Sequence, residues 1–295
     1  MPHILKNENI ELHIDSPLEG YKTSRFDWTG KITTLKFQNT QISCFENPNG
    51  ENEDQLGKGF YNEFGIDHAL GYEDTEIGGW FHKIGVGLLK KINHKYKCTK
   101  VYEVKPAQFT LTREDHKVLI RCQSEISNGY AYILDKHIEL QDNGFTITYN
   151  LENTGEKVII TDEYVHNFMS INNDAIGPNY ELNFPFNIKP DLFEETVNPE
   201  QKVLIGEKGL KFKNTIEKEY FFSNLSGNNY ENARWELKNS KSTITISETG
   251  SFKTNKVNIW GQKHVISPEL FVAININPGK STKWSRHYKI ANTTL

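Results

Sequence analysis

Alternation between apolar and polar residues is the main pattern along this chain. Such a period of two is typical of a strand with one buried face. It recurs in the runs KITTLKFQ, KVLIRCQSEI, AYILDKHIEL, FTITYNLEN, KVIITDEYV, STITISE, NIWGQ and FVAINI. Turn signals separate the runs, among them Asn-Gly pairs at 49–50, 128–129 and 143–144. No long run has the 3.6-residue period of a helix, so the pattern predicts an all-β fold, a large antiparallel β-sandwich with few or no long helices.

Two stretches interrupt this pattern. Residues 47–79 are rich in Asn, Gly, Glu and Asp, and residues 172–199 carry Asn, Pro and Phe. Loops longer than about 12–15 residues in a compact domain are commonly functional, so the first stretch is expected to border a site. No linker, repeat or low-complexity tract divides the chain, and we expect one β-sandwich domain over residues 1–295.

Composition excludes several classes of protein. The 295 residues carry 34 Lys and Arg against 38 Asp and Glu, which gives a net charge of −4 and offers no basic field for nucleic acid. Aromatic residues make up 12% and hydrophobic residues 36%, which is unlike a disordered chain. No apolar run approaches the ~20 residues of a membrane span, and the first residues lack the pattern of a secretory signal. We therefore expect a cytoplasmic protein without a membrane or nucleic-acid partner.

The cysteines and the common catalytic motifs narrow the chemistry further. Cys44, Cys98 and Cys122 are odd in number and share no CxxC spacing, so reduced thiols are expected rather than a disulfide framework or a zinc site. The sequence contains no GxxxxGK[ST], GxGxxG after a strand, HExxH or GxSxG motif. Carboxylate and imidazole side chains therefore remain as the candidate catalytic groups.

His166 is the first candidate for that chemistry. It lies in the segment TDEYVHNFMSIN (161–172), directly after an alternating run. An imidazole has an unperturbed pKa near ~6.5, which suits a general acid or base at neutral pH. A single His between Val and Asn is more often a hydrogen-bonded sheet residue, so the segment alone does not establish a catalytic role.

Glu269 is the second candidate. It follows Ser267-Pro268 and enters the apolar strand LFVAINI. A carboxyl group beside apolar and aromatic residues can have a raised pKa and transfer protons, although a Glu at the start of a strand is usually solvated.

Two further segments combine charge with aromatic residues. In TSRFDWTGKI (23–32), Arg25 and Asp27 alternate with aromatic residues, so the polar pair could share one face of a sheet. An exposed cross-strand ion pair worth ~0.2–1 kcal/mol is the simpler interpretation. In NEFGI (62–66) and WFHKIGVG (80–87), glycines bracket Glu63, His82 and Lys83. Turn chemistry explains the glycines but not this clustering of charge.

Taken in chain order, these segments resemble the galactose mutarotase-like superfamily, which includes aldose 1-epimerases and hexose-phosphate epimerases. The resemblance is carried by RFDWTGKI early in the chain, by VHNFMSI in the middle, and by Glu269 followed by FVAINI and the turn Asn277-Pro278-Gly279-Lys280-Ser281. Members of that family are single large β-sandwiches of about this length. The similarity covers nearly the whole chain, although each motif is short.

The resemblance implies a mechanism. In that family the His gives a proton to the ring oxygen of a sugar while the Glu takes one from the anomeric hydroxyl. Carried over, His166 is the acid and Glu269 the base of an aldose 1-epimerase acting on a free hexose or a modified or acidic hexose. No metal or organic cofactor is implied, and Trp260 could stack on the apolar side of the sugar.

The sequence also departs from the family pattern. A second His is expected in an H-G-F or H-G-G context, and here either His82 or Lys83 could take its place. Lys83 and Arg25 would form a cationic pair suited to a carboxylate, sulfate or phosphate on the substrate. Glu63, Arg25, His82, Lys83 and Trp260 are therefore the expected substrate-binding residues.

Two alternatives stay open from the sequence. One is a non-catalytic carbohydrate-binding protein on the same sandwich, which would need the aromatic and Arg contacts but not both His166 and Glu269. The other is a lyase or hydrolase, for which Glu63 and Glu269 are candidate carboxylates flanking a glycosidic bond at ~5–9.5 Å. The expected partner is a small sugar, and the chain is expected to be a monomer or a homodimer.

Overall fold

The computed structural model describes residues 2–50 and 53–292 and is built from strands. It contains 24 strands and three short 3-10 turns, and within the described ranges no α-helix is assigned. Each alternating run of the sequence lies on a strand, which confirms the predicted all-β fold. Every strand pairing in the ladders is antiparallel, as hairpin connections between successive strands allow.

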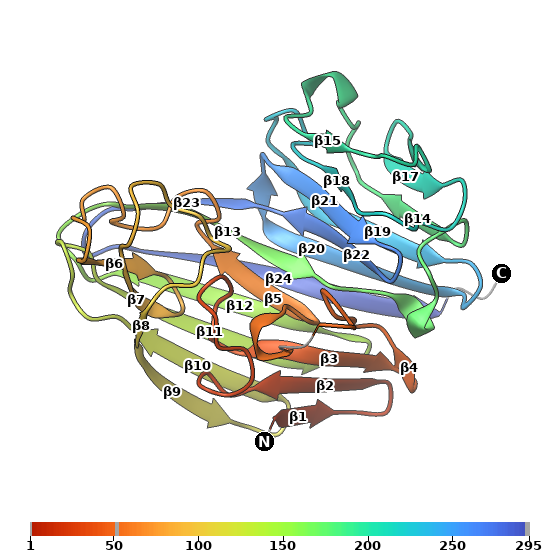
Figure 1. The fold of residues 1–295 in the computed structure, drawn as a ribbon. Coiled ribbons are helices and arrows are strands. Elements are labelled where there is room, and N and C mark those ends of the chain that lie inside the picture. The colour runs from red at the N-terminus through yellow and green to blue at the C-terminus, as the bar shows by residue number, and fades with distance from the viewer. Residues whose placement is uncertain (1, 51–52, 293–295) are drawn as a thin grey trace.

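The first sheet is seven-stranded and holds much of the N-terminal part of the chain (Figure 1). Its order is β1 (His3–Lys6), β2 (Ile10–Asp15), β3 (Lys31–Phe37), β5 (Phe60–Phe64), β13 (Ile159–Asn167) and β23 (Val272–Ile276), with β4 (Thr40–Gln41) beside β3.

The second sheet has ten strands and runs the length of the molecule. Its order is β16 (Val203–Ile205), β17 (Gly209–Phe212), β14 (Tyr180–Asn183), β19 (Glu231–Asn239), β20 (Ile244–Thr254), β24 (Ser281–Asn292), β12 (Gly144–Asn153), β11 (Tyr132–Gln141), β10 (Lys117–Gln123) and β9 (Gln108–Arg113).

Two smaller sheets complete the fold. One consists of β15 (Thr196–Val197), β18 (Tyr220–Phe222), β21 (Val257–Gln262) and β22 (Val265–Leu270), and the other of β6 (Trp80–Lys83), β7 (Gly87–Lys90) and β8 (Val104–Pro106). The 3-10 turns are η1 (Glu53–Gln55), η2 (Ile171–Asn173) and η3 (Pro190–Leu192). In Figure 1 the three-stranded sheet (β6, β7 and β8) and the four-stranded sheet (β15, β18, β21 and β22) lie at opposite sides of the molecule, with β5 and β13 between them.

The two large sheets pack face to face through their apolar sides. Phe60 on β5 contacts Phe145 and Tyr288 of the ten-stranded sheet, with ring centroids 5.4 and 5.1 Å apart. One cluster of buried apolar residues includes members of both large sheets and of the four-stranded sheet. Aromatic edge-to-face packing of this kind contributes beyond the burial of area itself.

Charged residues are also buried between the sheets. Arg286 on β24 donates to Glu163 at 2.7 Å and pairs with Glu248 on β20, and all three are shielded from solvent. Because an unpaired charge in the interior is very costly, these pairs fix which face of β13 turns inward. This orientation sets the position of every side chain on the opposite face of β13.

One local prediction was wrong. Residues 23–29 form no strand, and Asp27 does not pair with Arg25. Asp27 is instead buried, accepting hydrogen bonds from Thr29 and pairing with Lys136 at 3.3 Å. The buried Lys136 needs a carboxylate, and this need outweighs the local alternation of the sequence.

Within residues 2–50 and 53–292, no helix is long and apolar enough to cross a membrane.

Candidate active site

The site begins with the alternation of side chains along β13. Glu163 and Asn167 point into the core, where Glu163 meets Arg286 and Asn167 accepts a hydrogen bond from Tyr288 at 2.9 Å. Successive strand residues face opposite sides. Tyr164 and His166 therefore face away from the core, toward β22.

His166 and Glu269 meet at this point. Glu269 lies on β22, whose ladder with β21 places it opposite Asn258. The Nε2 atom of His166 is 3.4 Å from Oε1 of Glu269, and each side chain is only 4% exposed. Ser267 donates its hydroxyl to the same carboxyl oxygen at 3.3 Å. Residues 103 positions apart in the chain thus form one polar pair.

Aromatic rings surround the imidazole. Phe168 stacks on His166 with ring centroids 4.0 Å apart, and Trp260 meets it edge-on at 5.2 Å. Burial is the main reason why the pKa of His166 lies well below its ordinary value, and the positive charge of Arg25 lowers it further. The imidazole is therefore neutral, and its Nδ1 atom has no hydrogen-bond partner among the described residues.

Burial acts in the opposite direction on Glu269. It raises the pKa of the carboxyl to about 8, against the lowering effects of Arg25 and the Ser267 hydroxyl. Near neutral pH the carboxyl is therefore protonated while the imidazole is not. The pair therefore carries one titratable proton, on Glu269, 3.4 Å from the imidazole.

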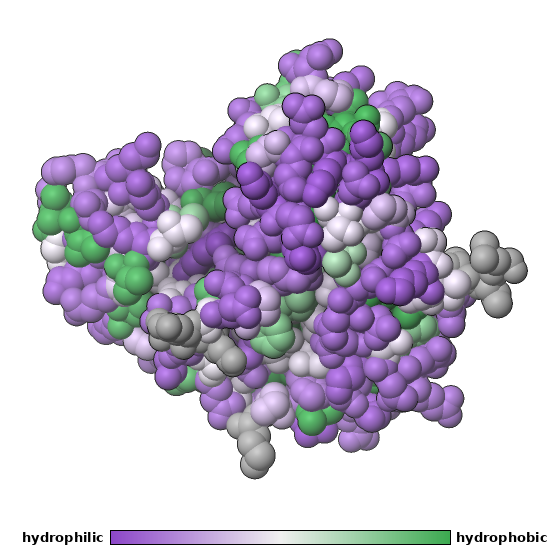
Figure 2. Space-filling view, turned by 45° about the vertical axis from the view of Figure 1, so that its right-hand side comes forward, coloured by the Kyte–Doolittle hydropathy of each residue, from purple (hydrophilic) through white to green (hydrophobic). Residues whose placement is uncertain are grey.

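The pair opens onto a pocket of about 440 Å³. Its wall combines hydrogen-bonding side chains with apolar and aromatic ones, as small-molecule sites usually do. The lining includes Arg25, Glu46, Leu56, Tyr164, Glu219, Asn258, Trp260 and Gln262. Figure 2 shows the surface hollowed between the two projecting parts of the molecule.

Arg25 enters this pocket above a buried ion cluster. Its guanidinium donates to Glu63 at 3.1 Å and to Glu46 at 3.2 Å, and it lies over the ring of Phe26. Glu63 is fully buried and also accepts from Lys83 at 3.2 Å and from the Tyr164 hydroxyl at 2.7 Å.

The two cations decide the charge of Glu63. Burial would raise the pKa of this carboxyl, but Lys83 and Arg25 hold it below its usual value. Glu63 is therefore ionised beneath the pocket.

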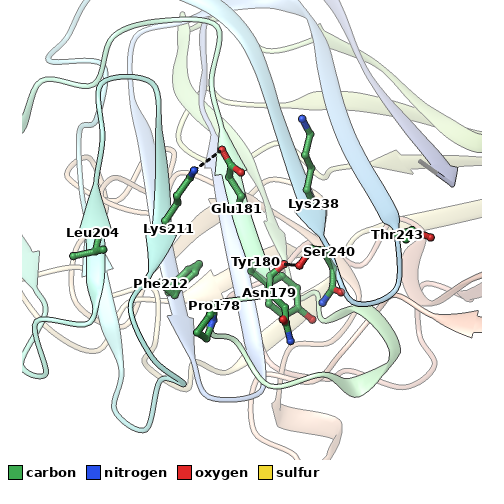
Figure 3. Close-up of a pocket in the computed structure, with 11 residues that line it drawn as sticks. Pro178, Asn179, Tyr180, Glu181, Leu204, Lys211, Phe212, Lys238, Ser240 and Thr243 are labelled. Carbon is green, nitrogen blue, oxygen red and sulfur yellow. Dashed lines mark hydrogen bonds and ion pairs between the residues drawn. The ribbon is translucent and has the colours of Figure 1, made fainter. Parts of the chain in front are cut away.

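A larger pocket of about 490 Å³ lies elsewhere, over β14, β17 and β19 (Figure 3). Glu181 and Lys211 pair across it at 3.6 Å, and Lys238 points along its edge. Its lining contains neither a His nor a second carboxylate, so it lacks the opposed proton donor and acceptor found beside β13. We therefore place the candidate active site in the pocket of His166 and Glu269.

Comparison with known proteins identifies the architecture. No protein-family model and no curated protein matches the sequence. Solved structures do match: a galactose mutarotase-like protein from Lactobacillus casei has a TM-score of 0.62 at 12% identity, covering 99% of this chain and 100% of that one. A protein of Escherichia coli K12, provisionally named an aldose 1-epimerase, has a TM-score of 0.61 at 12% identity, covering 99% of both chains. The Slr1438 protein from Synechocystis has a TM-score of 0.62 at 13% identity, covering 99% of this chain and 96% of that one.

The chain has the galactose mutarotase-like fold. The resemblance read from the sequence is thus confirmed for the architecture, over nearly the full chain and at low identity.

This mutarotase-like fold brings together some of the expected residues. His166, Glu269, Arg25 and Trp260 all line the one pocket, although they come from separate parts of the chain. Glu63 does not line it and lies behind Arg25 and Tyr164.

The other expected residues lie elsewhere. Lys83 is 1% exposed and is bound to Glu63 and to the hydroxyl of Tyr96 at 2.9 Å, so the expected pair of free cations is not assembled in the pocket. His82 borders a small void near Phe64 and makes a 3.1 Å hydrogen bond with the carbonyl of Tyr130. Burial lowers the pKa of His82 to about 4, so it is neutral. Neither His82 nor Lys83 lines the pocket of His166 and Glu269.

Several pocket residues were missed from the sequence. Tyr164 could have been found, because it lies two positions before His166 and alternation puts both on one face. Nothing in the sequence indicated four other lining residues, because loops and a separate sheet place them at the pocket: Glu46, Glu219, Asn258 and Gln262.

Within the described ranges, no group of three or more His, Cys, Asp or Glu side chains could hold a metal ion.

Proposed function

We propose that this protein is an aldose 1-epimerase-type mutarotase that interconverts the α and β anomers of a free hexose. One observation carries the proposal: an imidazole and a carboxyl group meet at 3.4 Å beside a pocket, with their pKa values shifted in opposite directions. Pairs of titratable groups whose environments separate their pKa values are typical of acid–base catalysis. The fold of the structural neighbours agrees with this chemistry.

The reaction needs one proton donor and one acceptor. The acceptor removes the proton of the anomeric hydroxyl, the C1–O1 bond gains double-bond character, and the bond from C1 to the ring oxygen breaks. The donor protonates the ring oxygen. Rotation about the C1–C2 bond presents the other face of the carbonyl, and the reverse steps close the ring as the opposite anomer.

A pair that holds one proton matches this requirement. The family resemblance makes His166 the acid and Glu269 the base, whereas the sugar-free site carries the proton on Glu269. For the family assignment, the proton passes from Glu269 to His166 across their contact before the ring opens. The reverse assignment, with Glu269 as donor, needs no such transfer. Each positioned group typically contributes ~10²–10⁴-fold to the rate.

The other pocket residues would bind the sugar. Trp260 offers an aromatic face beside His166, and Asn258 and Gln262 offer amides to sugar hydroxyls. Arg25 uses three of its five N–H donors on Glu63, Glu46 and Tyr164, which leaves two for a neutral oxygen acceptor.

Proton NMR saturation transfer between α and β signals tests the proposal. The panel is glucose, galactose, their 6-phosphates and glucuronate, each measured with the wild type and with Glu269→Gln. Exchange that the wild type accelerates and the variant does not would support the mutarotase. Binding without accelerated exchange would instead favour a carbohydrate-binding protein on this fold.

Glycoside cleavage is not proposed. It would need Glu63 and Glu269 in the same pocket, and only Glu269 lines the pocket.

A further inference from the structure

A second chamber adjoins the catalytic pocket. It has a volume of about 180 Å³, and the acid–base pair does not line it. Arg25, Glu46 and Leu56 line both cavities. These three side chains therefore form the boundary between the two spaces.

The boundary is built from side chains and is held at a fixed place. Arg25 and Glu46 pair at 3.2 Å, and Glu46 also accepts the backbone N–H of Gly57 at 2.8 Å. Both ionic side chains are partly exposed, at 20% and 23%, and both line the two cavities, so a ligand in either cavity could contact them. A ligand that spans both cavities would pass directly over this ion pair.

The lining of the chamber suits a sugar ring. Thr23 and Thr99 supply hydroxyls and Gln55 an amide, while Tyr21 and Phe26 supply aromatic carbon. Sugar rings combine polar edges with apolar faces, and a mixed lining of this kind can bind both. At roughly 30 Å³ per water molecule, the chamber has the volume of about six waters, which exceeds the space needed by a single hydroxyl group.

The catalytic pocket does not need this chamber for one ring. Pockets of roughly 300–1,000 Å³ enclose ligands of drug size, and the pocket of His166 alone measures about 440 Å³. The extra space therefore points to a ligand with a part beyond the reacting ring.

We propose that the chamber is a second sugar subsite, so that the preferred substrate is the reducing end of a disaccharide or longer saccharide. This inference rests on the proposed mutarotase function. Only a ring with a free C1 hydroxyl can open, so the second unit must be joined through another oxygen of the reacting ring. That ring lies beside His166 and Glu269, and the next unit crosses the Arg25–Glu46 pair into the chamber.

The first experiment compares substrates with the wild-type protein. Anomer exchange is measured by saturation transfer for glucose and for the reducing disaccharides maltose, cellobiose, isomaltose and laminaribiose. We expect at least one linkage to have kcat/KM about tenfold or more above that of glucose, equivalent to one extra binding contact of about 1.4 kcal/mol. Equal or lower values for all four disaccharides would overturn the inference.

Variants then locate the subsite. Thr99 and Val101 are exposed and line only the chamber, so Thr99→Trp and Val101→Trp should fill it without touching the acid–base pair. Each should raise KM for the preferred disaccharide about tenfold and leave kcat/KM for glucose within about twofold. Lys95→Trp is the matched control, since Lys95 is exposed in the same segment and lines neither cavity. A loss for the disaccharide that is equal in the control, or equal for glucose, would contradict the subsite.

A binding measurement separates the two proposals. Isothermal titration of the same sugars does not depend on turnover. If no sugar exchanges faster with the protein, the mutarotase proposal fails, while tighter binding of a disaccharide that Thr99→Trp abolishes would still support the subsite. If glucose exchanges but disaccharides neither bind more tightly nor react faster, the subsite fails and the mutarotase stands.

Discussion

Arg25 and Lys83 meet opposite oxygens of one buried carboxylate, that of Glu63. The Nε atom of Arg25 lies 3.1 Å from Oε2, and the Nζ atom of Lys83 lies 3.2 Å from Oε1. Lys83 is thereby withdrawn from the pocket, and Arg25 reaches the pocket only between two carboxylates, Glu63 and Glu46. We expect the charge of this cluster to affect the stability of the fold beneath the site and the preference of the pocket for neutral or charged ligands.

Removing the charge of Glu63 should destabilise the protein strongly. Glu63→Gln leaves the Lys83 ammonium buried without its carboxylate, and such a loss typically costs about 3–5 kcal/mol in the free energy of unfolding. Urea denaturation followed by tryptophan fluorescence would measure it. The double variant Glu63→Gln/Lys83→Met should recover part of the loss because it removes the stranded charge. A double variant less stable than Glu63→Gln would show that the ammonium is not the source of the cost.

Neutral hexoses should be better substrates than acidic ones. Besides Glu269, which is protonated near neutral pH, the pocket lining carries the carboxyl groups of Glu46 and Glu219 against the single cation Arg25, which is already paired. A carboxylate or phosphate on the sugar would find no free positive charge there and would be repelled by the ionised groups. We expect kcat/KM for glucose to exceed that for glucuronate and glucose 6-phosphate by about tenfold or more at low salt, with the difference shrinking as salt is added. A preference for the acidic sugars would contradict this prediction and would support the cationic site expected from the sequence.

His166→Ala and Glu269→Gln should each reduce anomer exchange by about 10²–10⁴-fold. Both side chains are buried beside the pocket and neither belongs to the apolar core, so the folded state should persist and circular dichroism should be unchanged. The double variant should be little slower than either single variant, because two groups that share one proton act as a unit. Independent, multiplicative losses would argue that only one of the two transfers a proton.

The rate should also depend on pH in a defined way. Burial raises the pKa of Glu269 to about 8 and lowers that of His166 well below its ordinary value. The state with one proton on the pair therefore exists between the lowered pKa of His166 and about pH 8. We expect kcat/KM for glucose to be level through neutral pH and to fall above about pH 8, as the pair loses its proton. A rate that rises through that range would show that Glu269 must be ionised before the sugar binds.

The sequence by itself determined the class of fold and predicted a candidate acid–base pair. Strand alternation depends only on local backbone geometry, so runs such as FTITYNLEN and FVAINI could be assigned from their own residues. His166 follows one such run and Glu269 precedes another, and the resemblance of their segments to a known family made them the acid–base candidates. Residues 23–29 were misjudged, because the partner that decides their structure, Lys136, lies more than one hundred positions away.

Tertiary structure alone decided the environment of this candidate pair. Their pKa values depend on burial and on the aromatic rings around them, and neither quantity can be read from the order of residues. The packing of the sheets and of the loops beside them also decided that Lys83 neutralises Glu63 below the pocket and that Arg25 and Glu46 lie between it and a second chamber. Electrostatic interactions fall off over a few ångströms, so the charge of a site is settled by which distant segments the fold brings into contact.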